Sequence, residues 1–228
     1  MTDFQIVPYN CMTGKENMEY DENLLNNAIL SCSDKFYFRL YGWEPSCVSL
    51  GRNQSSDFVN KLLLDELGID IVHRLTGGRA LLHDKELTYS VVCHQTLLNN
   101  GQSVLSSYKE ISEILIDSFA KLDVALSLGG DAVHTNHDYC MLVSTGADLN
   151  YQGKKLVGSA QCRKKGYILQ HGSILFDYDK TLLEKIFNEP VDGASIISIK
   201  EIFPDISFED FVKNFSKAIS EVLSQKLY

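Results

Sequence analysis

Residues 74–84 read RLTGGRALLHD, the most unusual stretch of the chain. Its adjacent glycines, Gly77 and Gly78, let a backbone approach a ligand closely and expose its N–H groups. The flanking Arg74 and Arg79 suit an anionic group, because guanidinium ions form charge-assisted hydrogen bonds. The same composition is also typical of a surface hairpin turn. The stretch is therefore either a ligand-binding loop or an ordinary turn.

The sequence around this stretch favours strands and helices that arrive in groups. Strands are expected at residues 36–41, 47–50, 69–73, 80–83, 87–93, 155–161 and 167–176. Helices are expected at residues 16–32, 58–67 and 103–122, and from residue 207 onward. Because the strands do not alternate strictly with helices, the order predicts an α+β fold with a mixed, largely antiparallel sheet. Neither glycine-rich nucleotide-binding motif, GxGxxG or GxxxxGK[ST], occurs.

The composition is that of a globular protein with a substantial core. Of the 228 residues, 44% are hydrophobic and 22% are charged, and the chain contains no repeat or linker-like tract. One domain over residues 1–228 is the simplest organisation. The 21 basic and 30 acidic residues leave a net charge of −9. A net negative charge does not favour general binding to nucleic acid or to an anionic membrane.

The chain is expected to be cytoplasmic. It contains no apolar run of the roughly 18 residues that a membrane-spanning helix needs. Residues 1–10 have neither the Lys or Arg nor the long apolar stretch of a secretory signal. The six cysteines are scattered without a CxxC pair, which indicates free thiols in a reducing compartment.

A second segment with candidate functional residues, GKKLVGSAQ, covers residues 153–161. In a strand, Lys155, Val157, Ser159 and Gln161 share one face, because side chains alternate with a period of two. The lysine would then lie beside a narrow slot that small residues line. An edge strand with a solvated lysine is the alternative.

Cys140 is a candidate nucleophile, provided that a nearby cation or base favours its thiolate. The partners nearest in sequence are Lys155, His134 and His137, and the alternative is a buried, unreactive cysteine. His134, His137 and Cys140 also follow each other at metal-ligand-like spacing. A structural zinc site needs four ligands, and no fourth is evident, so no metal is predicted.

Together with further segments, these motifs resemble the catalytic domain of the biotin/lipoate protein ligase family. The resemblance covers nearly the whole chain and is greatest to the octanoyltransferase branch, whose members use a cysteine. It begins with NMxxDE at residues 17–22 and WxPxxxSLGRxQ at residues 43–54. It is most specific in RxTGGRAxLHxxELTYS at residues 74–90, in KxxGSAQxR at residues 155–163 and in LQHGS at residues 169–173.

The resemblance implies a mixed sheet flanked by helices and assigns roles to individual residues. The family's invariant lysine falls on Lys155, and its acyl-accepting cysteine falls on Cys140. The Gly77–Gly78 segment is expected to cover an apolar acyl tunnel. The residues expected to bind substrate are Arg74, Gly77, Gly78, Arg79, Ala80, His83, Ser159, Ala160, His171 and Gly172.

The implied reaction is protein lipoylation by transfer of an octanoyl group, a step of lipoate biosynthesis. The donor would be octanoyl-acyl-carrier protein, and the acceptor would be a lysine of a lipoyl domain or of the glycine cleavage H protein. No cofactor is implied. Arg79 replaces a third glycine of the ligases' adenylate-binding loop, and the ligases' accessory domain is not expected here. Both departures favour transfer from a preformed thioester.

Two alternatives remain open. The first is an ATP- and Mg-dependent lipoate–protein ligase, in which Lys155 contacts a carboxylate or phosphate and Cys140 is dispensable. The second is a non-catalytic protein that binds lipoyl or octanoyl groups without turnover. For the transferase we also expect a local basic face, since acyl-carrier proteins and lipoyl domains are typically acidic. Its candidate residues are Arg52, Arg74, Arg79, Arg163, Lys164 and Lys165.

Overall fold

The computed structural model describes residues 3–130, 138–142 and 148–226. Over these residues the strands form a seven-stranded and a three-stranded sheet. The large sheet has the order β1 (Phe4–Met12), β2 (Phe36–Trp43), β6 (Glu86–His94), β10 (Tyr167–Leu175), β9 (Lys154–Lys164), β8 (Leu149–Tyr151), β7 (Leu126–Leu128). The small sheet has the order β4 (Asp70–His73), β3 (Cys47–Leu50), β5 (Leu81–His83).

The strand directions confirm the predicted sheet type. Only the β1–β2 pair of the large sheet and the β3–β4 pair of the small sheet run parallel among the described strands. All the other described pairs run antiparallel. The predicted hairpin between β9 and β10 turns at Lys165 and Gly166, whose φ angles are 52° and 82°. Two successive positive φ angles match the right-handed twist of the flanking strands.

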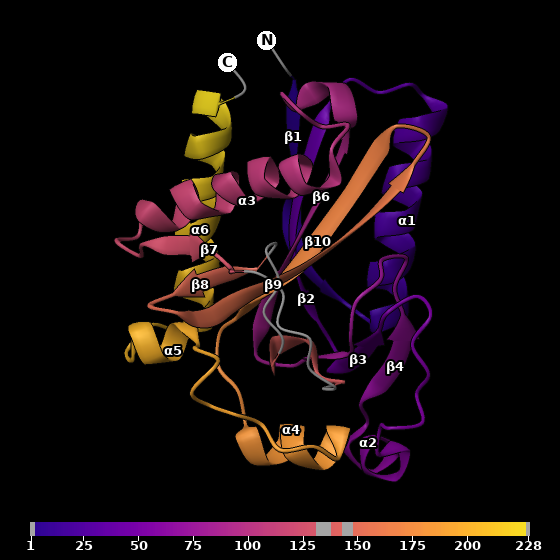
Figure 1. The fold of residues 1–228 in the computed structure, drawn as a ribbon, viewed down its shortest axis with the longest axis vertical. Helices are drawn as coiled ribbons and strands as arrows, with labels where there is room; N and C mark the ends of the chain where they lie inside the picture. The colour runs from indigo at the N-terminus through magenta and orange to yellow at the C-terminus, as the bar shows by residue number, and fades with distance from the viewer. Residues whose placement is uncertain (1–2, 131–137, 143–147, 227–228) are drawn as a thin grey trace.

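Helices cover both faces of the large sheet (Figure 1). They are α1 (Gly14–Leu30), α2 (Lys61–Leu67), α3 (Val104–Ala120), α4 (Lys180–Phe187), α5 (Ile199–Ile202) and α6 (Phe208–Lys226). Two short 3-10 helices, η1 (Gln95–Leu97) and η2 (Cys140–Leu142), complete the described elements. None of the helices in the described ranges is long and apolar enough to cross a membrane.

The central strands separate two layers of core. In β6, Tyr89 and Val91 belong to the core that includes residues of α3 and α6, while Val92 packs with Leu25 of α1 on the other face. Alternate residues therefore face opposite helical layers, because side chains of a strand point alternately to its two sides. Burial on both faces explains why β6 reads as a nearly continuous apolar run.

Caps set the helix boundaries. Thr13 and Glu16 form a capping box, so α1 begins two residues before the expected start at residue 16. Asn60 caps α2, so that helix begins at Lys61 rather than at residue 58, and it ends at Gly68 as predicted, with φ at 65°. Ser103 caps α3, and Ser207 accepts the Asp210 N–H at the start of α6.

Candidate active site

A cavity of about 50 Å³ lies where the central strands of the large sheet meet β3 and β5 of the small sheet. Its wall includes Met18 of α1, Cys140 of η2, and residues of β2, β3, β5, β6, β9 and β10. The predicted site residues that line it are Arg74, Gly78, His83, Cys140, Ser159, Ala160, His171 and Gly172. Gly77, Arg79, Ala80 and Lys155 lie close in sequence to that wall without lining it. These eight residues, which come from several strands and loops, thus border one cavity.

The loop of residues 74–80, which we call the glycine loop, packs tightly against the end of β3. A Cβ atom on Gly51 would lie 2.0 Å from the carbonyl oxygen of Gly78, so the two backbones meet at a distance that only glycine at position 51 permits. Gly78 itself has φ at 95°, a conformation that favours glycine. Backbone geometry therefore requires glycine at both positions, independently of any contact with a ligand.

Arg74 holds the glycine loop from inside. Its side chain donates hydrogen bonds to the carbonyl oxygens of Ser49, Gly77 and Arg79 and to the Ser49 hydroxyl, at 2.7–3.1 Å. The residue is 8% exposed. All of these acceptors belong to the protein, so the guanidinium, which the sequence suggested for an anionic substrate group, positions the loop that borders the cavity.

The glycine loop is in turn bonded to the Cys140 segment. Ala80 N–H donates to the Asp138 carbonyl at 3.0 Å, and Cys140 N–H donates to the Ala80 carbonyl at 2.8 Å. Cys140 is partly exposed and lines the cavity. The position of the cysteine is thus fixed by a chain of contacts that begins at Arg74. His134 and His137, the other local candidates, lie outside the described residues.

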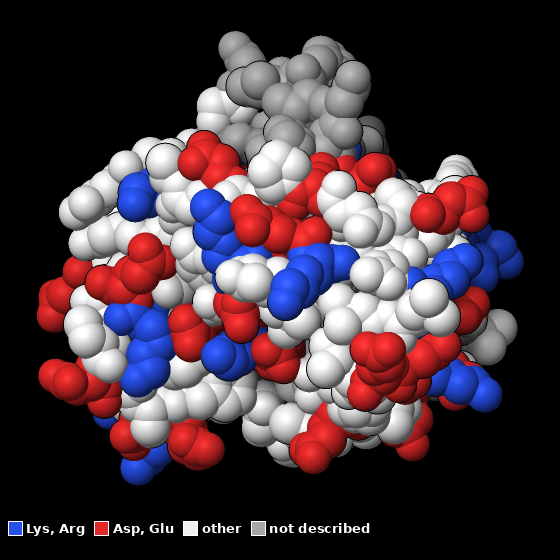
Figure 2. Space-filling view, turned by 90° about the horizontal axis from the view of Figure 1, so that it is seen from below, with Lys and Arg blue, Asp and Glu red and all other residues white. Residues whose placement is uncertain are grey.

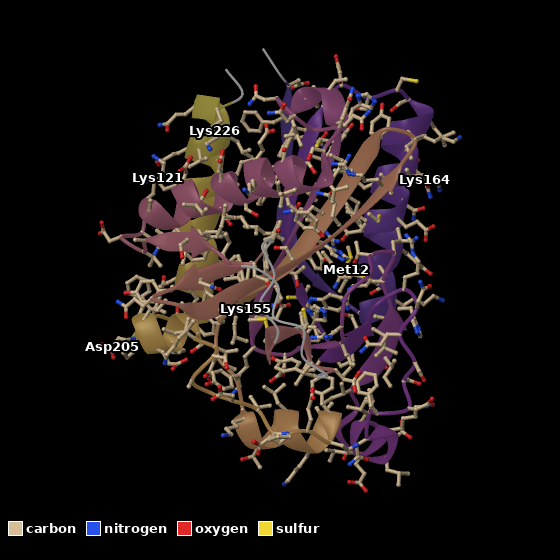
Figure 3. All side chains as sticks on the ribbon, viewed as in Figure 1. Met12, Lys121, Lys155, Lys164, Asp205 and Lys226 are labelled. Atoms are coloured by element: carbon tan, nitrogen blue, oxygen red, sulfur yellow. The ribbon has the colours of Figure 1, made fainter. Side chains whose placement is uncertain are left out.

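Lys155 reaches the same segment from β9. Its Nζ donates a hydrogen bond to the carbonyl oxygen of Cys140 at 2.9 Å and forms an ion pair with Asp148 Oδ2 at 3.0 Å. Figure 3 shows Lys155 near the centre of the molecule, whereas Lys121 and Lys226 lie at its periphery. A buried ammonium needs such partners, and Lys155 is only 3% exposed. The ammonium is therefore fixed at the backbone of the cysteine.

Asp148 is a site residue that the sequence did not reveal. It is 1% exposed, and its second carboxylate oxygen accepts the N–H of Ser159 at 3.3 Å. It therefore links the lysine to the part of β9 that lines the cavity. No motif marks it, because its partners lie seven and eleven residues away on a neighbouring strand.

His171 belongs to a buried network around Asp21. Its Nε2 pairs with Thr76 Oγ1 at 2.7 Å, and its Nδ1 lies 3.5 Å from Asp21 Oδ2. Burial raises the pKa of the Asp21 carboxyl, but the contacts with His171, Arg39 and Ser90 outweigh it and hold that pKa below its ordinary value. Thr76 belongs to the glycine loop, so this network supports the loop from the α1 side.

His83 belongs to a second buried network. Its Nε2 pairs with the Ser49 hydroxyl at 2.8 Å, its Nδ1 pairs with Glu86 Oε1 at 3.2 Å, and its ring stacks on Trp43 with centroids 3.9 Å apart. Burial lowers the pKa of His83 despite the neighbouring carboxylate. Burial therefore disfavours protonation of this imidazole in the folded protein.

The low pKa of His83 predicts a pH-dependent stability. Below pH 6.5, the ordinary value, the unfolded chain binds a proton at this residue more readily than the folded chain does. The free energy of unfolding should therefore fall as pH drops from about 7.5 to about 5.5, by up to about 1.4 kcal/mol per pH unit from this residue. Urea titrations at several pH values measure it, and His83→Gln should show a shallower dependence. An equal dependence in both proteins would contradict the assignment.

The predicted basic face is largely tied up in structural contacts. Arg163 donates to the backbone of Gln102 and Ser103 at the start of α3, and Lys164 donates to Asn26 of α1. On the lower face of the molecule, over α2 and α4, basic and acidic side chains are interspersed (Figure 2). Arg52 and Lys165 remain exposed candidates for contact with a carrier protein.

Comparison with known proteins places the chain in a family. Residues 13–220 match the lipoyl protein ligase A/B catalytic domain. The chain is 37% identical over 206 residues to a Symbiobacterium thermophilum protein named octanoyltransferase LipM, covering 83% of this chain and 71% of that protein. It is 32% identical to a Brevibacillus brevis protein of the same name, covering 100% of this chain and 89% of that protein.

Solved structures show the same fold. The structure described as lipoate-protein ligase A bound with ATP superposes with a TM-score of 0.79 at 22% identity, covering 98% of this chain and 86% of that one. It therefore matches the arrangement of mixed sheet and flanking helices. Together with the family match over residues 13–220, this shows that the chain belongs to the lipoyl protein ligase A/B catalytic domain family.

Proposed function

We propose that the protein is an octanoyltransferase, which moves an octanoyl group from a thioester on an acyl-carrier protein to the amine of a lysine on a lipoyl-accepting protein. One observation carries the proposal. A partly exposed cysteine lines a mostly apolar cavity, and a buried ammonium is bonded to the backbone of that same cysteine. The relatives named octanoyltransferase, which are similar over most of the chain, support the same activity.

In the first step, Cys140 Sγ attacks the carbonyl carbon of the donor thioester. A new carbon–sulfur bond forms, the bond to the carrier's sulfur breaks, and the proton from Cys140 ends on the departing thiol. The Lys155 ammonium stabilises the negative oxygen that develops during attack. Its bond to the Cys140 carbonyl keeps this charge beside the reacting residue.

In the second step, the neutral amine of the acceptor lysine attacks the acyl group on Cys140. An amide bond forms, the carbon–sulfur bond to Cys140 breaks, and a proton passes from the amine to the released thiolate. Both steps use the same carbonyl position, so the Lys155 charge assists each of them. The transfer consumes a preformed thioester, and we propose that it requires neither ATP nor a metal.

The cavity supplies the binding energy for the acyl tail. Apolar surface of Met18, Tyr41 and Leu81 contributes to its wall. Burying the six methylene groups of an octanoyl chain contributes about 5 kcal/mol, at roughly 0.8 kcal/mol for each. Gly172 lets β10 pack closely against its neighbours at this wall, because a Cβ there would lie 2.6 Å from the Tyr89 ring and 2.5 Å from the Gly158 carbonyl.

Intact-protein mass spectrometry tests this function. After incubation with octanoyl-acyl-carrier protein, the wild type should gain the mass of one octanoyl group, and Cys140→Ser should not. Cys162→Ser is the matched control, because this partly buried cysteine packs beside α1 and is not among the residues that line the cavity. It should still be acylated.

Three outcomes would contradict the proposal. Full transfer activity in Cys140→Ser would exclude the covalent intermediate. Pyrophosphate release that depends on free lipoate and ATP would favour a ligase instead. A protein that binds octanoyl groups but never transfers them would be a non-catalytic binder, and it would show no product on an acceptor lipoyl domain.

A further inference from the structure

Several residues of the cavity wall donate polar hydrogens to other protein atoms, and five of them belong to one hydrogen-bond network. They are Trp43, Ser49, His83, Thr88 and Ser173. Each of them lies on a strand next to the cavity and would otherwise offer a donor to a bound molecule. An acyl tail has no use for such donors, and a donor left unpaired in an apolar cavity is costly. The acceptors of these hydrogens therefore help to determine which acyl groups the cavity can bind.

The hydrogens converge on Glu86, which is 3% exposed and is not among the residues that line the cavity. Thr88 donates to its Oε1 at 2.7 Å, and Ser173 donates to its Oε2. His83 Nδ1 lies 3.2 Å from Oε1. Since a carboxylate has no hydrogen to give, the imidazole must be the donor in this contact.

The other two donors, Ser49 and Trp43, are linked to Glu86 indirectly, through His83 and Thr88. Because His83 donates from Nδ1, its neutral ring accepts at Nε2, so the Ser49 hydroxyl donates to it at 2.8 Å. Arg74 donates to the oxygen of that hydroxyl at 3.0 Å. Trp43 Nε1 donates to Thr88 Oγ1 at 2.8 Å, and Thr88 passes its own hydrogen to Glu86. All five hydrogens are thus taken up by other protein atoms.

We infer that Glu86 is a specificity-determining residue: by collecting these hydrogens it makes a partly polar wall select an unsubstituted hydrocarbon acyl chain over a hydroxylated one. The inference rests on the proposed octanoyl transfer. A hydroxyl group on the substrate would lose its water and find every one of these donors already used. Glu86 exerts this effect through Thr88, His83 and Ser173, without touching the acyl chain.

Glu86→Gln is the informative variant. The amide keeps one acceptor oxygen but replaces the other with an NH₂ group, which cannot accept. At least one of Thr88, Ser173 and His83 then loses its acceptor on residue 86. Since all three residues line the cavity, the freed donor becomes available to a bound acyl chain. A hydroxylated acyl chain gains a partner, while an octanoyl chain now meets an unsatisfied donor. The selectivity should therefore change in a defined direction.

The experiment compares the rate of Cys140 acylation by octanoyl thioester with the rates for octanoyl thioesters hydroxylated at carbon 3, 5 or 8. In Glu86→Gln, the ratio of kcat/KM for octanoyl to that for at least one hydroxylated donor should fall by roughly three- to tenfold, the value of one net hydrogen bond. A merely structural role would lower all four rates together and leave the ratios unchanged.

Two further variants guard against a folding defect. Glu201→Gln makes the same change in a carboxylate that caps α5 through Ser198, and it should leave the ratios as in the wild type. Thr88→Val is nearly isosteric and frees the Trp43 N–H on the cavity wall, so it should shift the ratio in the same direction as Glu86→Gln.

The outcomes separate this inference from the proposed function. If the wild type is not acylated by octanoyl thioester, the proposed function fails. If the wild type is acylated but neither Glu86→Gln nor Thr88→Val changes any ratio, the function stands and the role of Glu86 is refuted. A ratio that moves toward octanoyl in either variant would also refute it.

Discussion

Replacement of Lys155 with methionine should lower the rate of octanoyl transfer about 10²- to 10³-fold, the effect of removing one donor that stabilises a developing oxyanion. Methionine keeps most of the length of the side chain beside Gly158 but carries no charge. The loss should appear in the single-turnover rate of Cys140 acylation, measured by mass spectrometry at saturating donor. The binding of the acyl tail should change much less, because Lys155 is not among the residues that line the cavity.

Lys154→Met provides the matched control for this variant. Lys154 is the neighbouring residue at the start of β9, and its side chain points to the other side of the strand. Transfer should continue at close to the wild-type rate. A Lys155→Met protein that folds normally and retains more than about a tenth of the rate would exclude the electrostatic role that we assign to the ammonium.

Replacement of Arg39 with methionine should lower the free energy of unfolding by about 3–5 kcal/mol, because it leaves a buried charge without its partner. Arg39 NH1 lies 3.0 Å from Asp21 Oδ1, and neither side chain is more than 2% exposed. The guanidinium also stacks on the Tyr41 ring at 3.8 Å. Urea unfolding at neutral pH, followed by circular dichroism, measures the loss.

Two comparisons isolate the buried charge as the cause. Adding Asp21→Asn to Arg39→Met removes the orphaned carboxylate, so the double variant should recover part of the lost stability. Lys35→Met breaks an ion pair of the same 3.0 Å length at the surface, where both partners are well exposed, and should cost much less. Equal losses from the buried and the exposed pair would contradict this account.

Strong local patterns made much of the fold predictable. The apolar stripes of α3 and α6, the β9–β10 hairpin and the strands at β2, β3, β5 and β6 all follow from periodicity, caps and turn residues. The strand β1 was not predicted, nor were the short strands β7 and β8 and the short helices α4 and α5. Such short segments carry too little periodicity to identify an element, and these elements are held by tertiary contacts instead.

The site was predictable to the extent that it depends on motifs. Cys140 and the predicted residues Ser159, Ala160, His171 and Gly172 of β9 and β10 line one cavity. The roles of Asp148 and Glu86 were not predictable, because a buried carboxylate is defined by partners that the fold brings to it. Arg74 illustrates the converse: its charge suggested an anionic ligand, but its acceptors are carbonyl groups of its own loop and of β3.

The position of Met18 in the cavity wall has a practical consequence for anyone who cuts or permutes this chain. Helix α1 supplies both that methionine and Asp21, the carboxylate that binds β2, β6 and β10 together. A protein that lacks residues 1–30 would lose Met18 from the cavity wall and the buried carboxylate of Asp21. Fragment complementation or circular permutation has to keep this first helix covalently or tightly associated with the rest.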